Sequence, residues 1–454
     1  GNETFVPEVI ETTNEKFDSQ KESLVRPFKL EKGRLLRVAI YVTEDKKYLF
    51  TDFHHIIADG NSYDIIFEDI NKAYMGEKLE KESYTGFDAA LDEEQQMKEG
   101  KYKKAEKYYD SIFEGIETES LPMPDLNGKA PEKGYLEKTM SLKEETILSY
   151  CEKLGVTPNI LFTGLFGILM AKYSNAEDSL FSTIYNGRND SRLENTVCML
   201  VKTLPVYCKF DPKTTVQAYM AELSEQMLSS MANDIFPFSD ICAKYGLNSD
   251  LTFAYQAELS DDYPIGDTIA RGHDLSLDMA KMPLLIQVRE YNHTYVLTAE
   301  YRSDMYSQAF IDGILDSYEA AMSSMLKTKY VSEISVISQS GVNKIAEFNH
   351  TENEFDRSKT ISDMFAELAE TIPDHTAVVF KDRKYTYKEL DELSNRLGKY
   401  IASQGIGRED VVSILIPRCE YMAIVGRRPL LEKGVGRFDL LFLTGGKRHD
   451  NKIN

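Results

Sequence analysis

Apolar and polar residues alternate in two short stretches near the start of the chain, and this period of two predicts a β-hairpin. The stretches are Leu35–Tyr41 and Tyr48–Phe53, and the polar residues Glu44–Lys47 between them have the composition of a turn. The second stretch leads directly into two adjacent histidines, His54 and His55. We therefore expect a strand to deliver both histidines.

A different period begins after the histidines. Beyond Asp59 and Gly60 the apolar residues recur at helical spacing, and Ser62 is the expected N-cap of the helix. The apolar positions with this spacing are Ile65, Ile66, Ile70 and Tyr74. The sequence thus predicts an Asp-Gly turn that leads into an amphipathic helix.

Helical and strand-like segments are mixed along the next two hundred residues. The charged residues 91–113 predict a helix, and the Pro- and Gly-rich residues 115–134 predict a connection that bridges two lobes. After Thr157 an apolar run predicts a buried helix, and strands follow it, including a late hairpin that turns at Asn292-His293. Most strand pairs are expected to be antiparallel, so the predicted fold class is α+β.

The composition changes near residue 327. Residues 327–358 are polar and weakly periodic, which is typical of a linker. Residues 359–425 then show the helix–strand–helix order of a new α/β unit, and residues 426–454 are basic and lose clear periodicity. We expect a first domain over residues 1–326, the start of a second domain over 359–425, and a divergent tail that results from truncation or a frameshift.

Composition and charge narrow the class of protein. The 454 residues carry a formal charge of −21, which argues against nucleic acid or an anionic membrane as a partner. No apolar run approaches the ~18 residues of a membrane span, and the start of the chain lacks the pattern of a signal peptide. The five cysteines form no CxxC pair, so neither a zinc site nor a disulfide framework is expected. These features favour a cytoplasmic protein.

The candidate chemistry lies in His54, His55, Asp59 and Gly60. Adjacent strand residues point to opposite faces, so the two histidines are poorly placed to share one ion, and no bound metal is expected. A single imidazole can instead accept and return a proton near neutral pH. Asp59 can hold the turn through backbone N–H groups or through an arginine. The alternative is a pair of histidines packed in the core beside an ordinary Asx turn.

The pattern His-His-x-x-x-Asp-Gly resembles the active-site signature of condensation domains of nonribosomal peptide synthetases, which are relatives of chloramphenicol acetyltransferase. Further segments within residues 28–325 resemble family motifs in the same order: FKLEKGRLLRVAIY, YTGFDAAL, VCMLVKTLPV, NDIFPFSDI and NSDLTFAYQ. Cys198 and Lys202 stand where one motif commonly has Gly and Asn. The two N-terminal motifs of the family have no counterpart, so the resemblance implies a chloramphenicol acetyltransferase-like two-lobe fold with an incomplete first lobe.

The resemblance implies that the chain forms amide bonds. An acyl or peptidyl thioester on the phosphopantetheine of an upstream peptidyl carrier protein would pass to the amine of an aminoacyl thioester on a downstream one, and the chain itself would bind no cofactor. His55 would face the thioester, as a general base or as a positioning group, with His54 in support. Asp59 would pair with Arg188, and the Gly60 N–H would meet the developing oxyanion.

The stretch KYTYKELDELSNRLGKYIASQGIGREDVVSILIPR resembles the start of an adenylation domain, the AMP-binding module that activates an amino acid with ATP. The phosphate loop and the late catalytic lysine of such domains have no counterpart, so ATP binding is not expected in this chain. Two alternatives to the condensation function remain open. One is a catalytically inactive fragment, and the other is a stand-alone acyltransferase that takes a soluble thioester.

Overall fold

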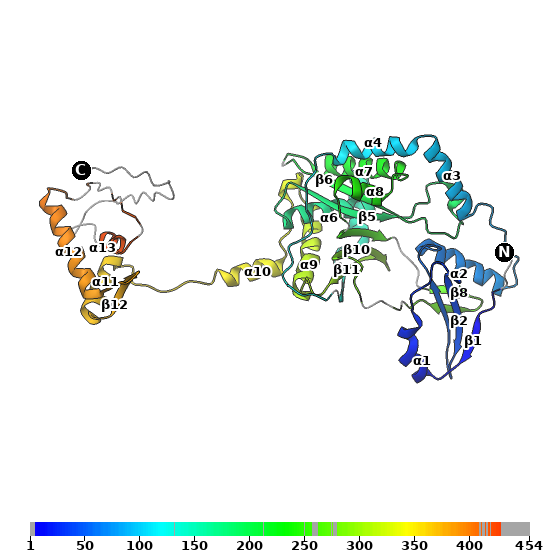
Figure 1. Cartoon of the computed structure of the whole chain (residues 1–454), viewed down its shortest axis with the longest axis horizontal. Helices are drawn as coiled ribbons and strands as arrows, with labels where there is room; N and C mark the ends of the chain where they lie inside the picture. The colour runs from blue at the N-terminus through cyan, green and yellow to red at the C-terminus, as the bar shows by residue number, and fades with distance from the viewer. Residues whose placement is uncertain are drawn as a thin grey trace. The chain divides into compact units, whose positions relative to one another are not determined.

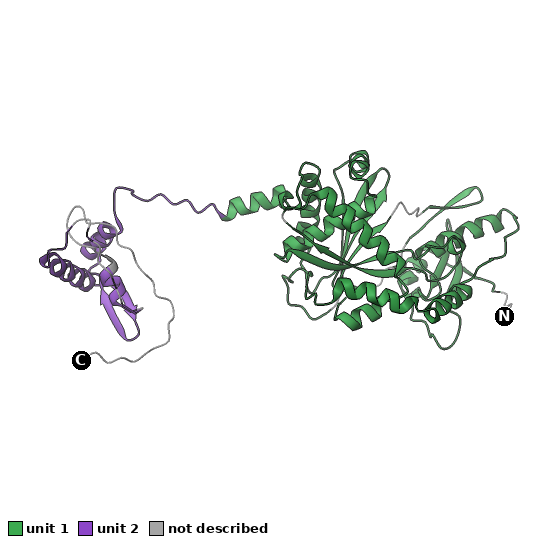
Figure 2. Ribbon diagram, turned by 90° about the horizontal axis from the view of Figure 1, so that it is seen from above, with its two compact units in different colours: residues 1–348 green, residues 349–454 purple. Residues whose placement is uncertain are grey.

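The chain forms two compact units in this computed structural model, residues 1–348 and residues 349–454 (Figure 2). The described residues are 5–427, except for 131, 212, 249, 257–261, 274, 276–278, 408, 409, 411–413, 415 and 418. The divergent tail expected over 426–454 therefore lies, beyond residue 427, outside the described residues. The division between the units falls within the polar stretch 327–358.

A six-stranded mixed sheet, here the large sheet, forms the centre of the first unit (Figure 1). Its strands in spatial order are β4 (Lys133–Thr139), β11 (Thr294–Arg302), β10 (Leu284–Tyr291), β7 (Leu251–Gln256), β5 (Asp178–Tyr185) and β6 (Lys202–Lys209). β7 runs parallel to both of its neighbours, and the other pairs in this sheet are antiparallel. The hairpin predicted at Asn292-His293 is confirmed, and both turn residues have positive φ.

Helices pack on the large sheet and supply most of the core. They include α5 (Glu144–Leu154), α6 (Pro158–Tyr173), α7 (Val216–Ala232) and α9 (Gln308–Met325). Every residue of α6 from Ile160 to Ala171 is buried, because this helix is apolar on all sides and has no face to present to water. The buried helix predicted after Thr157 is confirmed, with Thr157 as its N-cap.

In the described part of the chain, no single helix has both the length and the apolarity needed to cross a membrane. α5 and α6 reach those limits only when taken together, across a bend of 90°.

A second, three-stranded sheet carries the predicted hairpin, and it is called the small sheet below. Its order is β1 (Glu8–Glu11), β2 (Leu36–Val42) and β3 (Lys47–Phe53), with β2 and β3 antiparallel as predicted. The helices of this region are α1 (Asn14–Gln20), the 3-10 turn η1 (Lys21–Leu24) and α2 (Gly60–Tyr74). Ser62 is the only buried residue of α2, and α1 has none. The small sheet therefore has little apolar core of its own.

Two of the connections between the small-sheet region and the rest of the unit are made by whole helices and hairpins. The hairpin of β8 (Asp262–Ile265) and β9 (Thr268–Arg271) reaches α2, where Tyr263 stacks on Phe67 with ring centroids 4.3 Å apart. The second connection consists of α3 (Gly86–Lys98) and α4 (Lys101–Phe113), and α4 packs with α8 (Phe238–Tyr245). The single helix predicted over 91–113 is wrong, because Gly100 adopts φ +86° and divides it.

The polar stretch after residue 327 contributes to both units. In the first unit it forms η3 (Val331–Glu333) and α10 (Gln339–Phe348), and Val331 and Ile334 are buried in the main core. The second unit contains α11 (Ile361–Thr371), β12 (Thr376–Phe380), β13 (Arg383–Thr386), α12 (Tyr387–Ser403) and α13 (Tyr421–Arg427). Thr360 and Thr386 begin α11 and α12 with capping boxes, which explains why these helices start where they do.

Candidate functional site

The double histidine lies in a tight turn, residues 54–59, which we call the histidine turn. The His54 N–H donates to the Leu35 carbonyl at 2.9 Å, and the Ile57 N–H donates to the His54 carbonyl at 3.0 Å. β3 ends at Phe53, as predicted, so both histidines lie beyond the strand, in the turn that it leads into. His54 is half-buried and His55 is exposed, so their directions follow from the turn and not from strand alternation.

Two contacts fix the ring of His54. Its Nδ1 accepts a hydrogen bond from the Ile56 N–H at 3.1 Å, so the neutral ring carries its proton on Nε2. The ring also lies nearly perpendicular to Phe28, with centroids 5.8 Å apart and planes at 83°. The His54 ring is thus held by two contacts, whereas His55, the next residue, is exposed.

Asp59 ends the histidine turn and begins α2 as its N-cap. Its carboxylate accepts from the Ser62 N–H at 3.0 Å, and its own N–H donates to Ser62 Oγ at 3.2 Å. Asp59, not Ser62, therefore caps the helix, and the predicted cap is wrong by three residues. Ser62 instead completes a capping box from inside the first turn.

Arg188 binds Asp59 through a buried, two-point ion pair. Nη1 lies 2.9 Å from Oδ2 and Nη2 lies 3.1 Å from Oδ1, and the two side chains are only 6% and 3% exposed. The Leu200 and Val201 N–H groups also donate to Oδ2, at 2.9 and 3.2 Å. The pairing of Asp59 with Arg188 was predicted. The two backbone donors were missed, because an N–H group carries no residue-type signal.

The surroundings of Asp59 keep it ionised. Burial raises the pKa of this carboxyl, but hydrogen bonds from Arg188, Leu200 and Ser62 outweigh burial and leave the pKa below its ordinary value. Asp59 is therefore a structural anion at neutral pH and not a proton donor. Removing one partner from a buried pair of this kind costs about 3–5 kcal/mol.

The loop that supplies Arg188 connects β5 to β6 and folds around the guanidinium. Arg188 donates to the carbonyls of Asn186 and Thr196 at 3.3 and 3.1 Å. Gly187 has φ +67°, and a Cβ at this position would lie 1.8 Å from the Leu200 carbonyl oxygen. Only glycine fits this close approach of the two ends of the loop.

Gly60 occupies the first position of α2 and is exposed. A Cβ placed there meets no atom within 4 Å, and its φ lies outside the left-handed region. Neither backbone conformation nor protein packing therefore requires glycine at this position. The space beside the Gly60 backbone is open.

Cys198 packs against the start of α3. A Cβ on Gly86 would lie 2.7 Å from Cys198 Sγ, so the thiol occupies the space that a larger residue at position 86 would need. The Cys198 carbonyl lies 3.0 Å from Ser62 Oγ. Cys198 thus fills the space between α3 and the loop that holds Asp59.

Lys202 joins α3 to the base of the same loop. Its Nζ lies 3.4 Å from Glu93 Oε1 and 3.3 Å from Asp234 Oδ1, and the Tyr185 hydroxyl donates to Asp234. Burial, followed by the nearby charge of Glu93, raises the pKa of Asp234 to about 6. The two departures from the resembling motif, at 198 and 202, therefore both act on how the loop packs.

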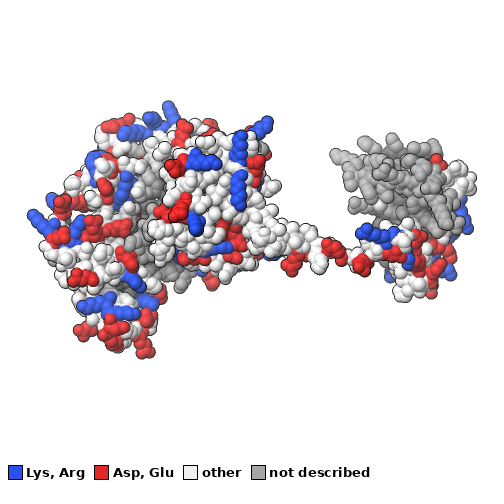
Figure 3. Space-filling model, turned by 180° about the vertical axis from the view of Figure 1, so that it is seen from behind, with Lys and Arg blue, Asp and Glu red and all other residues white. Residues whose placement is uncertain are grey.

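Two other kinds of site find no support on the face drawn in Figure 3 or among the described residues. On the face drawn in Figure 3, Lys and Arg side chains are interspersed with Asp and Glu and do not gather into a basic patch. Within the described residues, no group of three or more His, Cys, Asp or Glu side chains is arranged to hold a metal ion.

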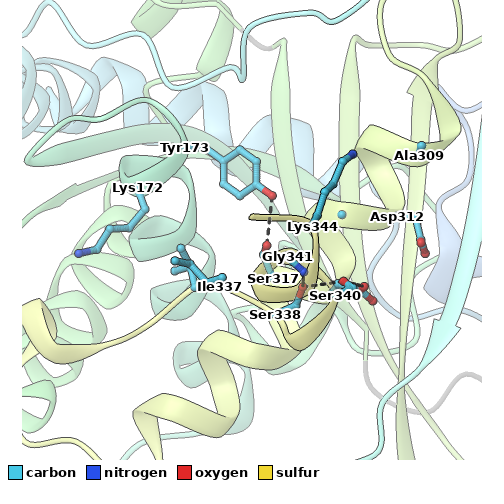
Figure 4. A pocket seen from close by; sticks show the side chains of 13 residues that line it. Lys172, Tyr173, Ala309, Asp312, Ser317, Ile337, Ser338, Ser340, Gly341 and Lys344 are labelled. Atoms are coloured by element: carbon cyan, nitrogen blue, oxygen red, sulfur yellow. Dashed lines mark hydrogen bonds between the residues drawn. The ribbon is translucent and has the colours of Figure 1, made fainter. Parts of the chain in front are cut away.

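A cavity of about 540 Å³ lies between α6, α9 and the start of α10 (Figure 4). Its wall includes Tyr173, whose hydroxyl donates to Ser317 at 3.2 Å, and Ser340, which donates to Asp316 at 2.9 Å. None of the five predicted site residues lines it. The cavity is therefore separate from the histidine turn.

Comparison with protein families gives two matches. Residues 6–345 match the model of the condensation domain, and residues 365–425 match that of the AMP-binding enzymes. The first match spans the histidine turn, the loop that holds Asp59 and the large sheet.

The curated relatives are large synthetases. Tyrocidine synthase 2 of Brevibacillus parabrevis is 26% identical over 436 residues, which cover 92% of this chain and 12% of that protein. Surfactin synthase subunit 1 of Bacillus subtilis (strain 168) is 26% identical over 440 residues, with the same two coverages. The chain thus spans about an eighth of the length of these relatives.

Solved structures share the fold. A four-domain nonribosomal peptide synthetase bound to AMP and glycine has a TM-score of 0.67 at 16% identity, over 90% of this chain and 34% of that one. The first condensation domain of the calcium-dependent antibiotic synthetase, in complex with a substrate analogue, has a TM-score of 0.58 at 15% identity, over 73% and 78%. The predicted α+β condensation fold is confirmed.

Proposed function

This chain belongs to the condensation-domain family and continues into the start of an AMP-binding domain, and from that membership we propose that it forms peptide bonds as part of a nonribosomal peptide synthetase. The donor is an acyl or peptidyl thioester and the acceptor is the amine of an aminoacyl thioester. Each is carried on the phosphopantetheine of a peptidyl carrier protein, upstream and downstream respectively. The chain itself binds no cofactor in this scheme.

The observation that supports this proposal is the way the histidine turn is held. Asp59 is buried and accepts hydrogen bonds from Arg188, Leu200, Val201 and Ser62, whereas His55 is exposed. A rigid turn that presents one imidazole to solvent is what a reaction between two delivered substrates needs, because most of the rate then comes from orientation.

In the proposed reaction the acceptor amine attacks the thioester carbonyl carbon. A C–N bond forms, the C–S bond breaks, and the proton lost by the amine ends on the departing thiol. His55 accepts that proton from the amine and returns it to the thiolate, or it orients the amine through a hydrogen bond. The Gly60 N–H donates to the oxyanion of the tetrahedral intermediate, and no acyl-enzyme forms. His54 supports His55, and the Asp59–Arg188 pair is structural.

The proposed organisation follows the same scheme. Residues 1–326 form the condensation domain, 327–358 the linker, 359–425 the start of the AMP-binding domain and 426–454 a divergent tail. The AMP-binding start is not assigned ATP binding. The setting is the cytoplasm, where the carrier proteins would deliver their substrates.

The test replaces His55 with Ala in the synthetase that contains this chain, with both carriers loaded. We expect amide formation to fall by about 10²–10⁴-fold, the usual contribution of a positioned acid–base group. His350→Ala is the matched control, because its side chain is 85% exposed and lies outside the histidine turn. Undiminished turnover by the His55→Ala enzyme would contradict the assignment. Parallel assays with free acyl-CoA as donor distinguish a stand-alone acyltransferase, which would accept it.

A further inference from the structure

Phe28 contacts His54 of the histidine turn and belongs to a segment without helix or strand, residues 25–29. The guanidinium of Arg37 covers this ring, with its central carbon 3.8 Å from the ring centroid. Arg37 itself is on β2 and forms an ion pair with Asp52, its cross-strand partner on β3. The small sheet thus holds a cation directly over Phe28.

Arg37 also fixes the irregular segment that carries Phe28. Its Nη1 donates to the Arg26 carbonyl at 2.7 Å, and its Nη2 donates to the Pro27 carbonyl at 3.0 Å. One planar guanidinium therefore binds an acid, two carbonyls and an aromatic ring. Lysine has neither the fork geometry nor the flat face to make these contacts together.

The same ring of Phe28 meets His54 nearly at right angles, with centroids 5.8 Å apart. Aromatic pairs in this geometry are favourable beyond their buried area. The Ile56 N–H also donates to Nδ1 of His54. His54 is therefore held between the Arg37–Phe28 stack and the backbone of the residue that follows His55.

We propose that Arg37 and Phe28 are positioning residues of the site: their stack holds the His54 ring with an unprotonated Nδ1, and the hydrogen bond to that nitrogen fixes the backbone around His55. The effect on the His54 ring follows from the contacts alone. The effect on turnover rests, in addition, on the proposed function of His55.

The first test reads the His54 ring directly in the full chain, labelled with ¹⁵N at histidine. Long-range ¹H–¹⁵N spectra are expected to show His54 with its proton on Nε2 only, and His54→Gln assigns the signal. Phe28→Leu and Arg37→Met should replace this pattern by exchange between both tautomers, whereas Phe28→Tyr, which keeps the aromatic face, should retain it. Arg289→Met is the control, because Arg289 pairs with Glu137 on the large sheet.

Thermal melts show whether the Arg37→Met and Phe28→Leu chains are folded. If Arg37→Met unfolds the small sheet, the test rests on Phe28→Leu, which is the milder change. Folded variants that keep an unchanged Nε2–H signal for His54 would overturn the proposal. A tautomer change in Phe28→Leu that Phe28→Tyr does not show supports it.

The second test measures turnover in the loaded synthetase. Phe28→Leu is expected to lower kcat roughly tenfold with little change in KM for either carrier, and Phe28→Tyr should restore it. Unchanged kcat in a Phe28→Leu enzyme whose His54 signal has changed would overturn the link from the stack to turnover. If His55→Ala is fully active, the proposed function fails, while the tautomer result stands by itself.

Discussion

The small-sheet region and the large-sheet region of the first unit are stabilised in different ways. Between residues 5 and 74, the buried apolar residues are Ala39 and Ala58, whereas the large sheet and its helices share one continuous core that includes Phe162 and Tyr318. The small-sheet region therefore relies on polar and aromatic contacts with other parts of the unit. The candidate site lies at one of these contacts, where Asp59 meets the loop between β5 and β6.

This difference has a consequence for how the site is maintained. A core built from many apolar contacts tolerates the loss of one of them without changing shape, but a region anchored by a few buried polar groups depends on each. The free energy of local unfolding should therefore be lower for the histidine turn than for the large sheet.

Asp59→Asn is expected to have the largest effect on this comparison. Asn is a good N-cap, so α2 can still begin at residue 60, but Arg188 is left as a buried cation without its partner. We expect a loss of about 3–5 kcal/mol in the free energy of unfolding, measured by urea titration. Hydrogen exchange should accelerate over residues 47–74 and leave the large sheet protected.

Asp190→Asn is the control for that experiment. Asp190 pairs with Arg192 in the same loop, but both side chains are about half exposed, and the change should leave stability and exchange unaltered. Equal exchange rates over residues 47–74 in Asp59→Asn and wild type would contradict the dependence of the small-sheet region on this ion pair.

Gly86→Ala tests the packing between α3 and the Asp59 loop. The new methyl group would lie 2.7 Å from Cys198 Sγ, and we expect a loss of about 1–3 kcal/mol in thermal or urea unfolding. Cys198→Gly in the same chain should recover most of the loss. Gly60→Ala is the matched control for stability, since it also opens a helix with a capping box but has open space beside it. If the changes in unfolding free energy caused by Gly86→Ala and Cys198→Gly simply add in the double mutant, the side chains at these two positions are not in contact.

The smallest expected effect is a pH dependence of opposite sign in the two regions. The pKa of Asp234 is raised to about 6, so the folded chain holds this proton more tightly than the unfolded chain, whose aspartates titrate near 3.9. The contribution of Asp234 to stability is therefore full below about pH 4 and falls as the pH rises to about 6. The pKa of Asp59 is lowered in the folded chain. Its contribution to stability is therefore full at a pH above the ordinary aspartate pKa, and it is lost as the pH falls through the pKa of the folded chain.

Urea titrations at pH 5 and pH 7 test this difference. Asp234→Asn should shrink the stability lost between those two pH values by about 1 kcal/mol. If the free energy of unfolding changes between the two pH values by the same amount in Asp234→Asn as in wild type, the folded chain does not hold this proton.

Much of the local structure followed from the sequence. Strand alternation determined β2 and β3 to within one residue, and the all-apolar run after Thr157 determined a buried helix. The double histidine with its Asp-Gly indicated the candidate site, and Arg188 was identified as the partner of Asp59 through the resemblance. These features depend on periods of two or 3.6 residues, or on residue types at short spacing. Both signals lie within short stretches of the sequence and can be read from it directly.

The tertiary structure alone decided how the site is held. It placed both histidines in a turn, made Asp59 the cap in place of Ser62, and brought the Leu200 and Val201 N–H groups to a carboxylate about 140 residues away in the chain. The contact of the Phe28 ring with Arg37 is a further case, because residues 25–29 form neither helix nor strand and so carry no period. Backbone donors are the same at every position, and contacts across long sequence separations leave no local period, so only the folded chain could reveal them.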